Sequence, residues 1–320
     1  MSILVVGSVA LDSIKTPSGE KKDILGGSAT YFSYSASFFA PPGGINLVAV
    51  VGSDFPKEHI ELLKSRNINL EGLKMVEGQT FRWSGSYEHD MNEAKTLSTC
   101  LNVFETFKPE IPESYKNSEF IFLANIDPDL QMDVLSQIKK PKLIAADSMN
   151  LWVKIKKPSL LKLLSKIDIL VINDGEARLL TEQSSLIKAG RIILDYGLKY
   201  VVIKKGGHGS LLFSQKGSIQ TKDGFFSAPA YPIEEVFDPT GAGDTFAGGF
   251  FGYLANSRHS GSAKLNLQDP TENDLRKAVI YGSVMASFNV EDFSLERMKR
   301  LQPAEIETRY KKFKEITHFR

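Results

Sequence analysis

One glycine-rich segment holds the residues of this sequence that are best suited to chemistry. Gly241, Ala242 and Gly243 stand directly before Asp244. Glycines reach positive φ and let backbone N–H groups approach a ligand closely. Apolar residues follow Asp244 at helical spacing, so these N–H groups are expected at a helix N-terminus, where an anion is favoured. Asp244 is then placed to take a proton from a hydroxyl group, while its neighbours stabilise negative charge on a transferred phosphate.

The longer segment that begins at Asp238 narrows this interpretation. A glycine turn before a helix is common, and taken by itself Asp244 serves equally well as a helix N-cap. The twelve residues from Asp238 to Gly249 resemble the second signature of the PfkB, or ribokinase-like, family of carbohydrate and nucleoside kinases. The resemblance extends over nearly the whole chain. It implies an ATP-dependent kinase in which Asp244 is the base and the three residues before it form the anion hole.

Residues that bind the acceptor, the molecule that receives the phosphate, are expected after the first strand. The resemblance implies that Asp12 contacts sugar hydroxyls, and a carboxylate that accepts two hydrogen bonds suits a vicinal diol. Gly26 and Gly27 match the family's paired-glycine substrate loop, where backbone amides approach a hydroxyl. Ser28 and Tyr31 stand where ribokinases often have lysine and asparagine, so polar reach is lost and an aromatic ring is added. The acceptor stays open between sugar and nucleoside, with a slight preference for a ligand bulkier than ribose.

The nucleotide side is expected at the ends of two later strands. Asn173 and Glu176 fit the family's N-x-x-E pattern, which positions Mg²⁺ and phosphate through water. A single glutamate with an asparagine suits an ion that keeps several waters, although the pattern alone is equally well a helix start. The turn after the next strand resembles the turn that approaches the ATP phosphates, which implies nucleotide contacts for Lys204, Gly206 and Gly209.

The resemblance assigns further residues around the glycine-rich segment. Thr240 and Asn289 are implied as nucleotide contacts, the latter on a late helix where the family packs adenine. Asp238 and Thr240 are implied to help hold a monovalent cation such as K⁺. Asp147 and Asn150 follow another strand and receive a supporting role near the phosphate path.

The elements that must position these residues alternate along the chain. Short apolar runs suited to strands buried on both faces alternate with helical patterns, which favours a doubly wound, mostly parallel α/β sheet with helices on both faces. The predicted strands are Ile3–Val6, Leu47–Val51, Phe120–Ala124, Leu143–Ala146, Ile169–Ile172 and Val201–Lys204. The predicted helices are Ser28–Phe39, Lys57–Ser65, Leu130–Ile138, Ser159–Ser165, Gly175–Leu180, Leu186–Tyr196 and Pro303–Arg320, and a β-meander is expected over Leu211–Tyr231 with a turn at Gly217.

The alternation of strands and helices is interrupted over Thr80–Phe107. Aromatic and polar residues alternate there, which predicts a β-hairpin that stands off the main sheet, with residues 13–25 contributing another strand. It fits the family's β-lid, so we expect a single ribokinase-like domain over residues 1–320 with a lid at about 80–107. A lid excludes water, which competes as phosphoryl acceptor, and it often carries residues that select the substrate; Arg82, Trp83 and Tyr87 are the candidates here. Exposed aromatic residues there equally suit a homodimer contact, since some relatives pair lid to lid.

Composition excludes several other classes. The 320 residues carry 39 Lys and Arg against 38 Asp and Glu, a net charge of +1, which argues against nucleic acid or a membrane surface as partner. A single cysteine, Cys100, excludes a disulfide scaffold and a multi-cysteine zinc site. No apolar run reaches the length that a bilayer demands and no signal peptide is evident, so a soluble cytoplasmic protein is expected.

Two alternative functions stay open at this point. A catalytically silent sugar- or nucleoside-binding regulator can share the fold, although an intact Asp244 and the Asn173/Glu176 pair argue against it. A dinucleotide-dependent oxidoreductase shares the layer architecture but lacks the glycine fingerprint with its acidic partner. A P-loop and a protein-kinase core are excluded because their motifs are absent.

Overall fold

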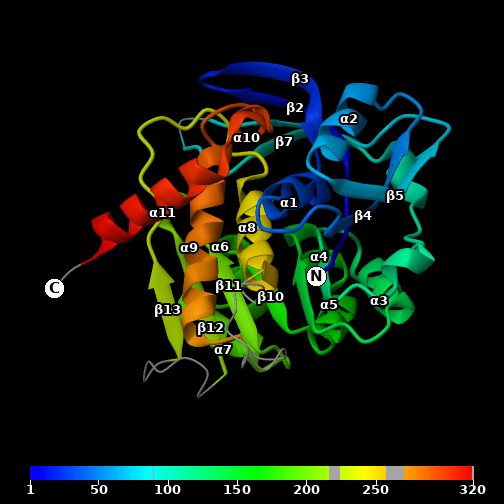
Figure 1. Ribbon diagram of the computed structural model, residues 1–320. Coiled ribbons are helices and arrows are strands. Elements are labelled where there is room, and N and C mark those ends of the chain that lie inside the picture. The colour runs from blue at the N-terminus through cyan, green and yellow to red at the C-terminus, as the bar shows by residue number, and fades with distance from the viewer. Residues whose placement is uncertain (89, 216–223, 257–269, 319–320) are drawn as a thin grey trace.

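A large sheet forms the centre of the computed structural model, which describes residues 1–88, 90–215, 224–256 and 270–318 (Figure 1). Within these residues nine strands pair in the order β13-β12-β11-β10-β9-β8-β1-β4-β5. All pairs from β11 to β5 are parallel, whereas β12 and β13 are antiparallel at one edge. The strands span Ile3–Val6 (β1), Ile45–Gly52 (β4), Ile68–Val76 (β5), Phe120–Leu123 (β8), Leu143–Asp147 (β9), Ile169–Asn173 (β10), Tyr200–Lys204 (β11), Ser210–Ser214 (β12) and Phe225–Ala228 (β13). The predicted mostly parallel α/β fold is confirmed.

Helices bury both faces of this sheet, as the continuous apolar strands require. In β1, Ile3 and Val5 belong to the core on one face, while Leu4 and Val6 belong to the core on the other. The first core packs against α1 (Ser28–Ala36), α2 (Lys57–Ser65), α8 (Ala242–Asn256), α9 (Glu272–Asn289), α10 (Glu296–Arg300) and α11 (Pro303–Thr317). The second packs against α3 (Pro128–Gln137), α4 (Asn150–Ile155), α5 (Lys157–Leu164), α6 (Asp174–Thr181) and α7 (Leu186–Leu194).

A second, small sheet lies beyond the carboxyl ends of the parallel strands, at the top of Figure 1. Its order is β3-β2-β6-β7, with bounds Ala10–Thr16 (β2), Gly19–Gly26 (β3), Arg82–Ser86 (β6) and Lys95–Cys100 (β7). β6 and β7 form the antiparallel pair expected within Thr80–Phe107, and β2 pairs with β6 in parallel. The chain therefore enters this outer layer twice, after β1 and after β5 of the main sheet. We call these four strands the small sheet.

Several boundaries differ from the sequence-based expectation. β5 was not predicted, because Glu71 and Lys74 interrupt its apolar pattern and it forms the edge of the main sheet. The six-residue helix α4 was also missed, and α1 ends at Ala36, three residues before Phe39. The turn predicted at Gly217 and the last two residues of the predicted C-terminal helix lie outside the described residues. None of the helices in the described ranges combines the length and apolar character that a membrane crossing requires.

Close packing of α8 on α1 fixes the helix that begins at the glycine turn. Ser35 Oγ on α1 donates to Thr245 O in the first part of α8, at 2.7 Å. At Gly248 a Cβ atom would lie 2.4 Å from Phe32 O and 2.8 Å from Ser35 Cβ. The absence of a side chain at Gly248 thus lets the two helices approach until backbone touches backbone.

We expect Gly248→Ala to destabilise the protein, although alanine is the better helix former by about 1 kcal/mol at an open site. The new methyl group meets a backbone oxygen, and such overpacking costs about 1–3 kcal/mol. Thermal unfolding measures the change, and a lowered Tm is the expected result. A Tm equal to or above that of the wild type would show that α1 and α8 can separate without loss.

Candidate active site

Four charged side chains meet where the parallel strands end and α8 begins. Asp147 ends β9, Lys204 ends β11, Glu176 lies in the first turn of α6, and Asp244 lies in the first turn of α8. The β10–β11 register pairs Asn173 with Lys204. Because carboxyl ends of parallel strands meet at one edge of a sheet, these residues converge although they are far apart in the sequence.

The glycine turn has the geometry that the sequence predicts for an anion site. Gly241 has φ +72°, in the left-handed region, and Ala242 begins α8. A Cβ atom at Gly241 would lie 2.4 Å from the ring of Tyr31, and one at Gly243 would lie 3.1 Å from Lys204 Nζ. The turn is therefore supported from below by an aromatic ring and approached from the side by an ammonium group, which favours a negatively charged ligand at this helix N-terminus.

Lys204 is held in this position by an ion pair. Its Nζ lies 3.1 Å from Asp147 Oδ2, and both side chains are largely buried. Asp147 is itself fixed, because Ser148 N donates to its Oδ1 at 2.7 Å and Gln131 Nε2 donates to its carbonyl oxygen at 3.1 Å. A buried pair that is anchored at the carboxylate leaves the ammonium with donors to spare for a phosphate oxygen.

The close carboxylates perturb one another. Burial raises the pKa of Asp244 to about 7, with a further upward contribution from Asp147 and an opposing one from Lys204. Burial likewise raises the pKa of Glu176 to about 8, with Asp147 adding to the rise. Burial alone would lower the pKa of Lys204, but the surrounding carboxylates, with Asp147 first, outweigh it and raise the pKa. Asp244 thus titrates in the range where a general base works best at neutral pH.

Asn173 and Glu176 lie together at the start of α6, where they form a capping box. Asn173 Oδ1 accepts from Glu176 N and Glu176 Oε2 accepts from Asn173 N, both at 2.8 Å. The alternative role that the sequence left open, a helix start, is therefore present. The same bonds hold one carboxylate oxygen of a buried glutamate and orient the group beside Asp147 and Lys204.

The residues that the sequence predicts for the acceptor surround Asp12, which is 4% exposed. A Cβ atom at Gly26 would lie 1.9 Å from Asp12 Oδ2, so the glycine at the end of β3 makes room for this carboxylate. Gly27, with φ +95°, precedes α1, and Ser28 N donates to Ser8 Oγ at 3.0 Å. The predicted paired-glycine loop and Asp12 are therefore brought into contact.

Burial raises the pKa of Asp12 to about 8, and the nearby carboxylate of Asp238 adds to the rise. Burial also raises the pKa of Tyr31, whose ring lies against Gly241. Tyr31 thus joins the acceptor side to the glycine turn.

A buried loop anchors the start of the glycine-rich segment. Asp238, fully buried, accepts from Thr240 N at 2.9 Å and from Ser294 N at 3.0 Å. Asn289 Nδ2 donates to Thr240 O at 2.9 Å, and its Oδ1 accepts from Thr245 Oγ1 at 3.0 Å. The Asn289 amide, which the resemblance implied to lie near adenine, is engaged on both sides with the segment that precedes and begins α8.

The small sheet brings Trp83 to the acceptor side and turns Arg82 away from it. Trp83 pairs in register with Asp12, whereas Arg82 pairs with Leu11, and successive strand residues face opposite sides. Arg82 is bound by Asp23 at 3.1 Å and by Asp54 at 2.7 Å. Arg82 therefore ties the small sheet to the loop after β4, and the Trp83 ring lies over Gly85 of its own strand.

The turn that follows β11 lies beside these charged groups. Gly206–His208 form one turn of 3₁₀ helix, and Gly206 and Gly209 have φ +53° and +84°. A Cβ atom at Gly209 would lie 2.1 Å from Ala228 O, so this glycine allows β11 and β13 to flank the turn closely. Within the turn, His208 N donates to Lys205 O and Gly209 N donates to Gly206 O, whereas Gly207 N donates out of the turn to Asn92 Oδ1.

The donor set fits a magnesium ion that is held mainly by water and phosphate. No group of three His, Cys, Asp or Glu side chains in the described ranges is arranged to hold a metal by itself. Glu176 supplies one buried carboxylate. Its Oε2 accepts the hydrogen bond of the capping box, and its other oxygen takes no part in the box. Mg²⁺ retains several waters and takes few protein carboxylates when phosphates are present, so this arrangement matches its chemistry.

Ser294 escaped sequence reasoning, and so did the contact partner of Tyr87. Ser294, with φ +52°, donates its N–H to Asp238 across 56 residues of sequence, and no motif surrounds it. The Tyr87 hydroxyl lies 3.3 Å from Thr240 Oγ1, a contact between the small sheet and the glycine-rich segment. The aromatic pattern of the hairpin drew attention to Tyr87, but its partner depends on how the two sheets are placed.

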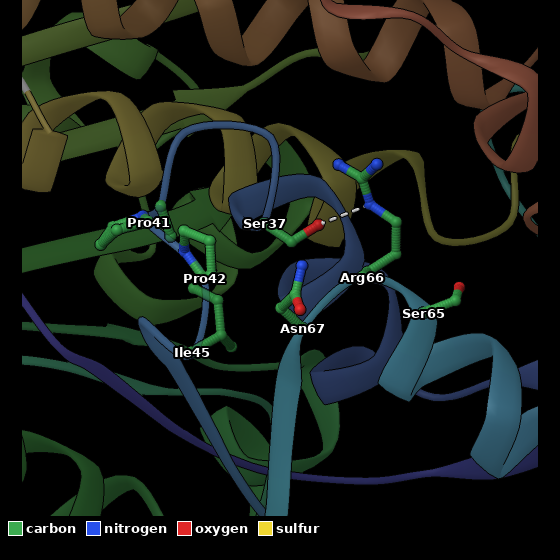
Figure 2. A pocket seen from close by; sticks show the side chains of 8 residues that line it. Ser37, Pro41, Pro42, Ile45, Ser65, Arg66 and Asn67 are labelled. Atoms are coloured by element: carbon green, nitrogen blue, oxygen red, sulfur yellow. Dashed lines mark hydrogen bonds between the residues drawn. The ribbon is translucent and has the colours of Figure 1, made fainter.

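Two surface cavities lie away from the candidate site. Figure 2 shows one of about 110 Å³ whose lining includes Ile45, the first residue of β4, so it lies at the amino end of the parallel strands. Arg66 Nε donates to Ser37 Oγ there at 3.1 Å. A second hollow, of about 360 Å³, lies between α11 and Tyr231 and is lined by Arg309, whose guanidinium is bound by Glu291.

Comparison with known proteins agrees with this geometry. A family model described as pfkB family carbohydrate kinase matches residues 43–299. The chain is 30% identical over 266 residues to a cytidine kinase of Thermococcus kodakarensis, an alignment that covers 81% of this chain and 90% of that protein. It is 25% identical over 307 residues to a nucleoside kinase of Methanocaldococcus jannaschii, which covers 90% of each protein.

Solved structures share the fold. A ribokinase from Giardia lamblia superposes with a TM-score of 0.81 at 18% identity, covering 98% of this chain and 99% of the other. The Methanocaldococcus jannaschii nucleoside kinase superposes with a TM-score of 0.72 at 22% identity and covers 98% and 99%. The ribokinase-like fold expected from the sequence is confirmed.

The raised pKa of Asp12 implies a stability cost that depends on pH. Between its unfolded value of 3.8 and its folded value of about 8, the folded state holds a proton that the unfolded state has lost, so stability falls as pH rises. We expect Asp12→Asn to raise Tm by about 2 °C or more at pH 8.5, with a smaller gain at pH 5. Calorimetry at both pH values checks this, and a Tm gain that is equal at both would contradict the burial of an ionised Asp12.

Proposed function

The chain belongs to the pfkB family of carbohydrate kinases, and from that membership we propose that it transfers phosphate from ATP to the hydroxymethyl group of a nucleoside. As a member of this family it is an ATP-dependent kinase of a sugar or nucleoside, and the nucleoside is the finer step. One observation carries the proposal. Asp244 lies in the first turn of α8 behind a glycine turn that the Lys204 ammonium approaches.

Support for a nucleoside acceptor comes from two directions. Two relatives that align over 81% and 90% of this chain bear the names cytidine kinase and nucleoside kinase. The acceptor side combines a carboxylate, Asp12, in register with an aromatic residue, Trp83. A ribose diol suits the first group and a flat base suits the second. We propose that Gly26, Gly27 and Ser28 contribute backbone contacts to the acceptor, and that Tyr31 closes the floor.

We propose that Asp244 acts as general base. Its carboxylate takes the proton of the acceptor hydroxyl as the oxygen attacks the terminal phosphorus and the bond to the leaving diphosphate breaks. Gly241, Ala242 and Gly243 form the anion hole, whose backbone N–H groups stabilise the charge on the transferred group. Lys204, anchored by Asp147, neutralises charge on the phosphates from the β11 side.

The nucleotide side of the proposal uses the remaining residues. Glu176, oriented by Asn173, holds Mg²⁺ through water, and Mg²⁺ when bound neutralises the phosphates. Relatives of the same fold support this cofactor, since an Escherichia coli protein titled a putative ribokinase II is solved with ATP and Mg²⁺. Gly206 and Gly209 shape the phosphate turn, and Thr240, supported by Asn289, lies next to the anion hole. We further propose K⁺ beside Asp238 and Thr240.

The small sheet is proposed as a lid that excludes water from the reacting phosphate. Tyr87 supports this role because its hydroxyl reaches Thr240 beside the glycine turn. Arg82, bound to Asp54 and Asp23, acts as the tie that sets the angle of the lid. The exposed outer strand β7, which carries Leu97 and is followed directly by the exposed Leu101, is proposed as the contact between two copies of the chain.

The first test is ATP turnover with Mg²⁺ and K⁺ against cytidine, other nucleosides, ribose and hexoses. We expect turnover with a nucleoside and a lower kcat/KM for ribose, which lacks the base that Trp83 faces. Turnover with ribose or a hexose in preference would overturn the nucleoside assignment. Binding of a nucleoside without ATP consumption would favour a silent regulator.

Asp244→Asn is expected to lower kcat by about a hundredfold or more, because the variant keeps the shape of the side chain but cannot take a proton. The matched control is Asp129→Asn, which changes an aspartate in the first turn of α3. We expect the control to retain wild-type kcat. Near-normal turnover by Asp244→Asn would contradict the base assignment.

The pH dependence of kcat offers an independent check. Since Asp244 must be ionised to accept a proton and its pKa is raised to about 7, kcat is expected to rise with pH through about 7 and then level off. A kcat that is flat from pH 5.5 to 8.5 would speak against a carboxylate base in this environment.

A further inference from the structure

The segment that joins β6 to β7 reaches across the site to the turn after β11. We define its described residues 90–94 as the tip. Asn92 Oδ1 accepts a hydrogen bond from Gly207 N at 3.2 Å. The same oxygen would lie 2.4 Å from a Cβ atom at Gly206, so the contact depends on glycine at that position. A residue of the small sheet thus occupies a backbone donor in the turn on which the proposed function places the ATP phosphates.

Asp90 fixes the orientation of the Asn92 amide. Asp90 Oδ1 accepts from Asn92 Nδ2 at 2.6 Å and from Asn92 N at 3.0 Å. A carboxylate can only accept, so the nitrogen of the amide must face Asp90 and the oxygen must face Gly207. The amide oxygen therefore presents to the glycine turn the kind of acceptor that a phosphate oxygen presents.

The tip is also negatively charged, which disfavours a nucleotide beside it. Asp90 and Glu93 lie on it within four residues, and Glu88 precedes it. Hydrogen bonds from Asn92, together with nearby His208 in the turn, lower the pKa of Asp90 and keep it ionised. Asp90 is hydrogen-bonded to Asn92, which contacts the turn directly, so these carboxylates repel a triphosphate placed there, most strongly at low salt. Tip and phosphates therefore oppose each other both for one donor and through charge.

We infer that the tip blocks the proposed phosphate site in the turn after β11. Asn92 Oδ1 occupies the position of a phosphate oxygen on Gly207 N, so the tip must move away from the turn before ATP can bind. This inference rests on the proposed function, because it takes the turn at Gly206–His208 as the phosphate site. Since the tip belongs to the small sheet, its departure moves the same layer that covers the acceptor. Nucleotide binding is thereby linked to the position of the lid.

The test compares the affinity of the full chain for Mg·ATP without acceptor in the wild type and in Asn92→Ala. Removing the amide frees Gly207 N, so we expect Kd for ATP to fall by about fivefold, the effect of one ordinary hydrogen bond. Ser98→Ala, an exposed position on β7, is the matched control and is expected to keep the wild-type Kd. An equal or higher Kd in Asn92→Ala overturns the inference.

A second variant tests the charge separately. Asp90→Asn keeps an acceptor for Asn92 but removes the negative charge, so we expect tighter ATP binding at low salt and a difference that fades as salt is added. Glu61→Gln on α2 is the control for loss of an exposed carboxylate. A gain in affinity that is the same at low and high salt would overturn the electrostatic part of the inference.

Tryptophan fluorescence reports on the small sheet directly. The chain has two tryptophans, and a Trp152→Phe background leaves Trp83 on β6 as the reporter. We expect ATP to change Trp83 emission, and Asn92→Ala without nucleotide to resemble the ATP-bound form. Failure of the wild type to bind or turn over ATP overturns the proposed function and this inference with it. Normal turnover with unchanged Trp83 emission and equal Kd overturns this inference alone.

Discussion

The ion pair between Lys204 and Asp147 is the interaction on which the rest of the site depends. The buried ammonium of Lys204 offsets the negative charge of the carboxylates around it. Without it, their burial would destabilise the folded protein, because burying an unpaired charge is far more costly than burying a pair. With Lys204 in place, Asp244 keeps a pKa near neutrality, and burial raises the pKa of Glu176 as well. The glycine turn, the N-terminus of α8 and the capping box of α6 are arranged around that one positive charge.

Much of the fold and the core of the site could be predicted because their signals are local. Strands that are buried on both faces can be recognised as continuous apolar runs. The residues from Asp238 to Asp244 are contiguous, so their pattern can be read directly from the sequence. β5 escaped because an edge strand exposes one side, and Glu71 and Lys74 then resemble a loop. Short alternating edges of this kind carry little of the periodicity on which such predictions depend.

The contacts that escaped prediction join distant parts of the chain. Lys204 and Asp147 are 57 residues apart, and their meeting depends on the order of β9, β10 and β11. Arg82 shows the same limit on a smaller scale. Its place next to Trp83 suggested a shared role, but the strand register sends one side chain toward Asp12 and the other toward Asp54. A one-residue shift in register would have exchanged them.

The ring of Tyr31 under Gly241 constrains how this enzyme can evolve or be redesigned. A residue proposed for the acceptor side also lies against the glycine turn, so a smaller or differently shaped side chain there leaves a cavity directly beneath that turn. New acceptor preferences are therefore more accessible through the small sheet, where Trp83 can change without disturbing α8. In laboratory selection for a new substrate, adaptive substitutions should accumulate on β6 while Tyr31 stays fixed.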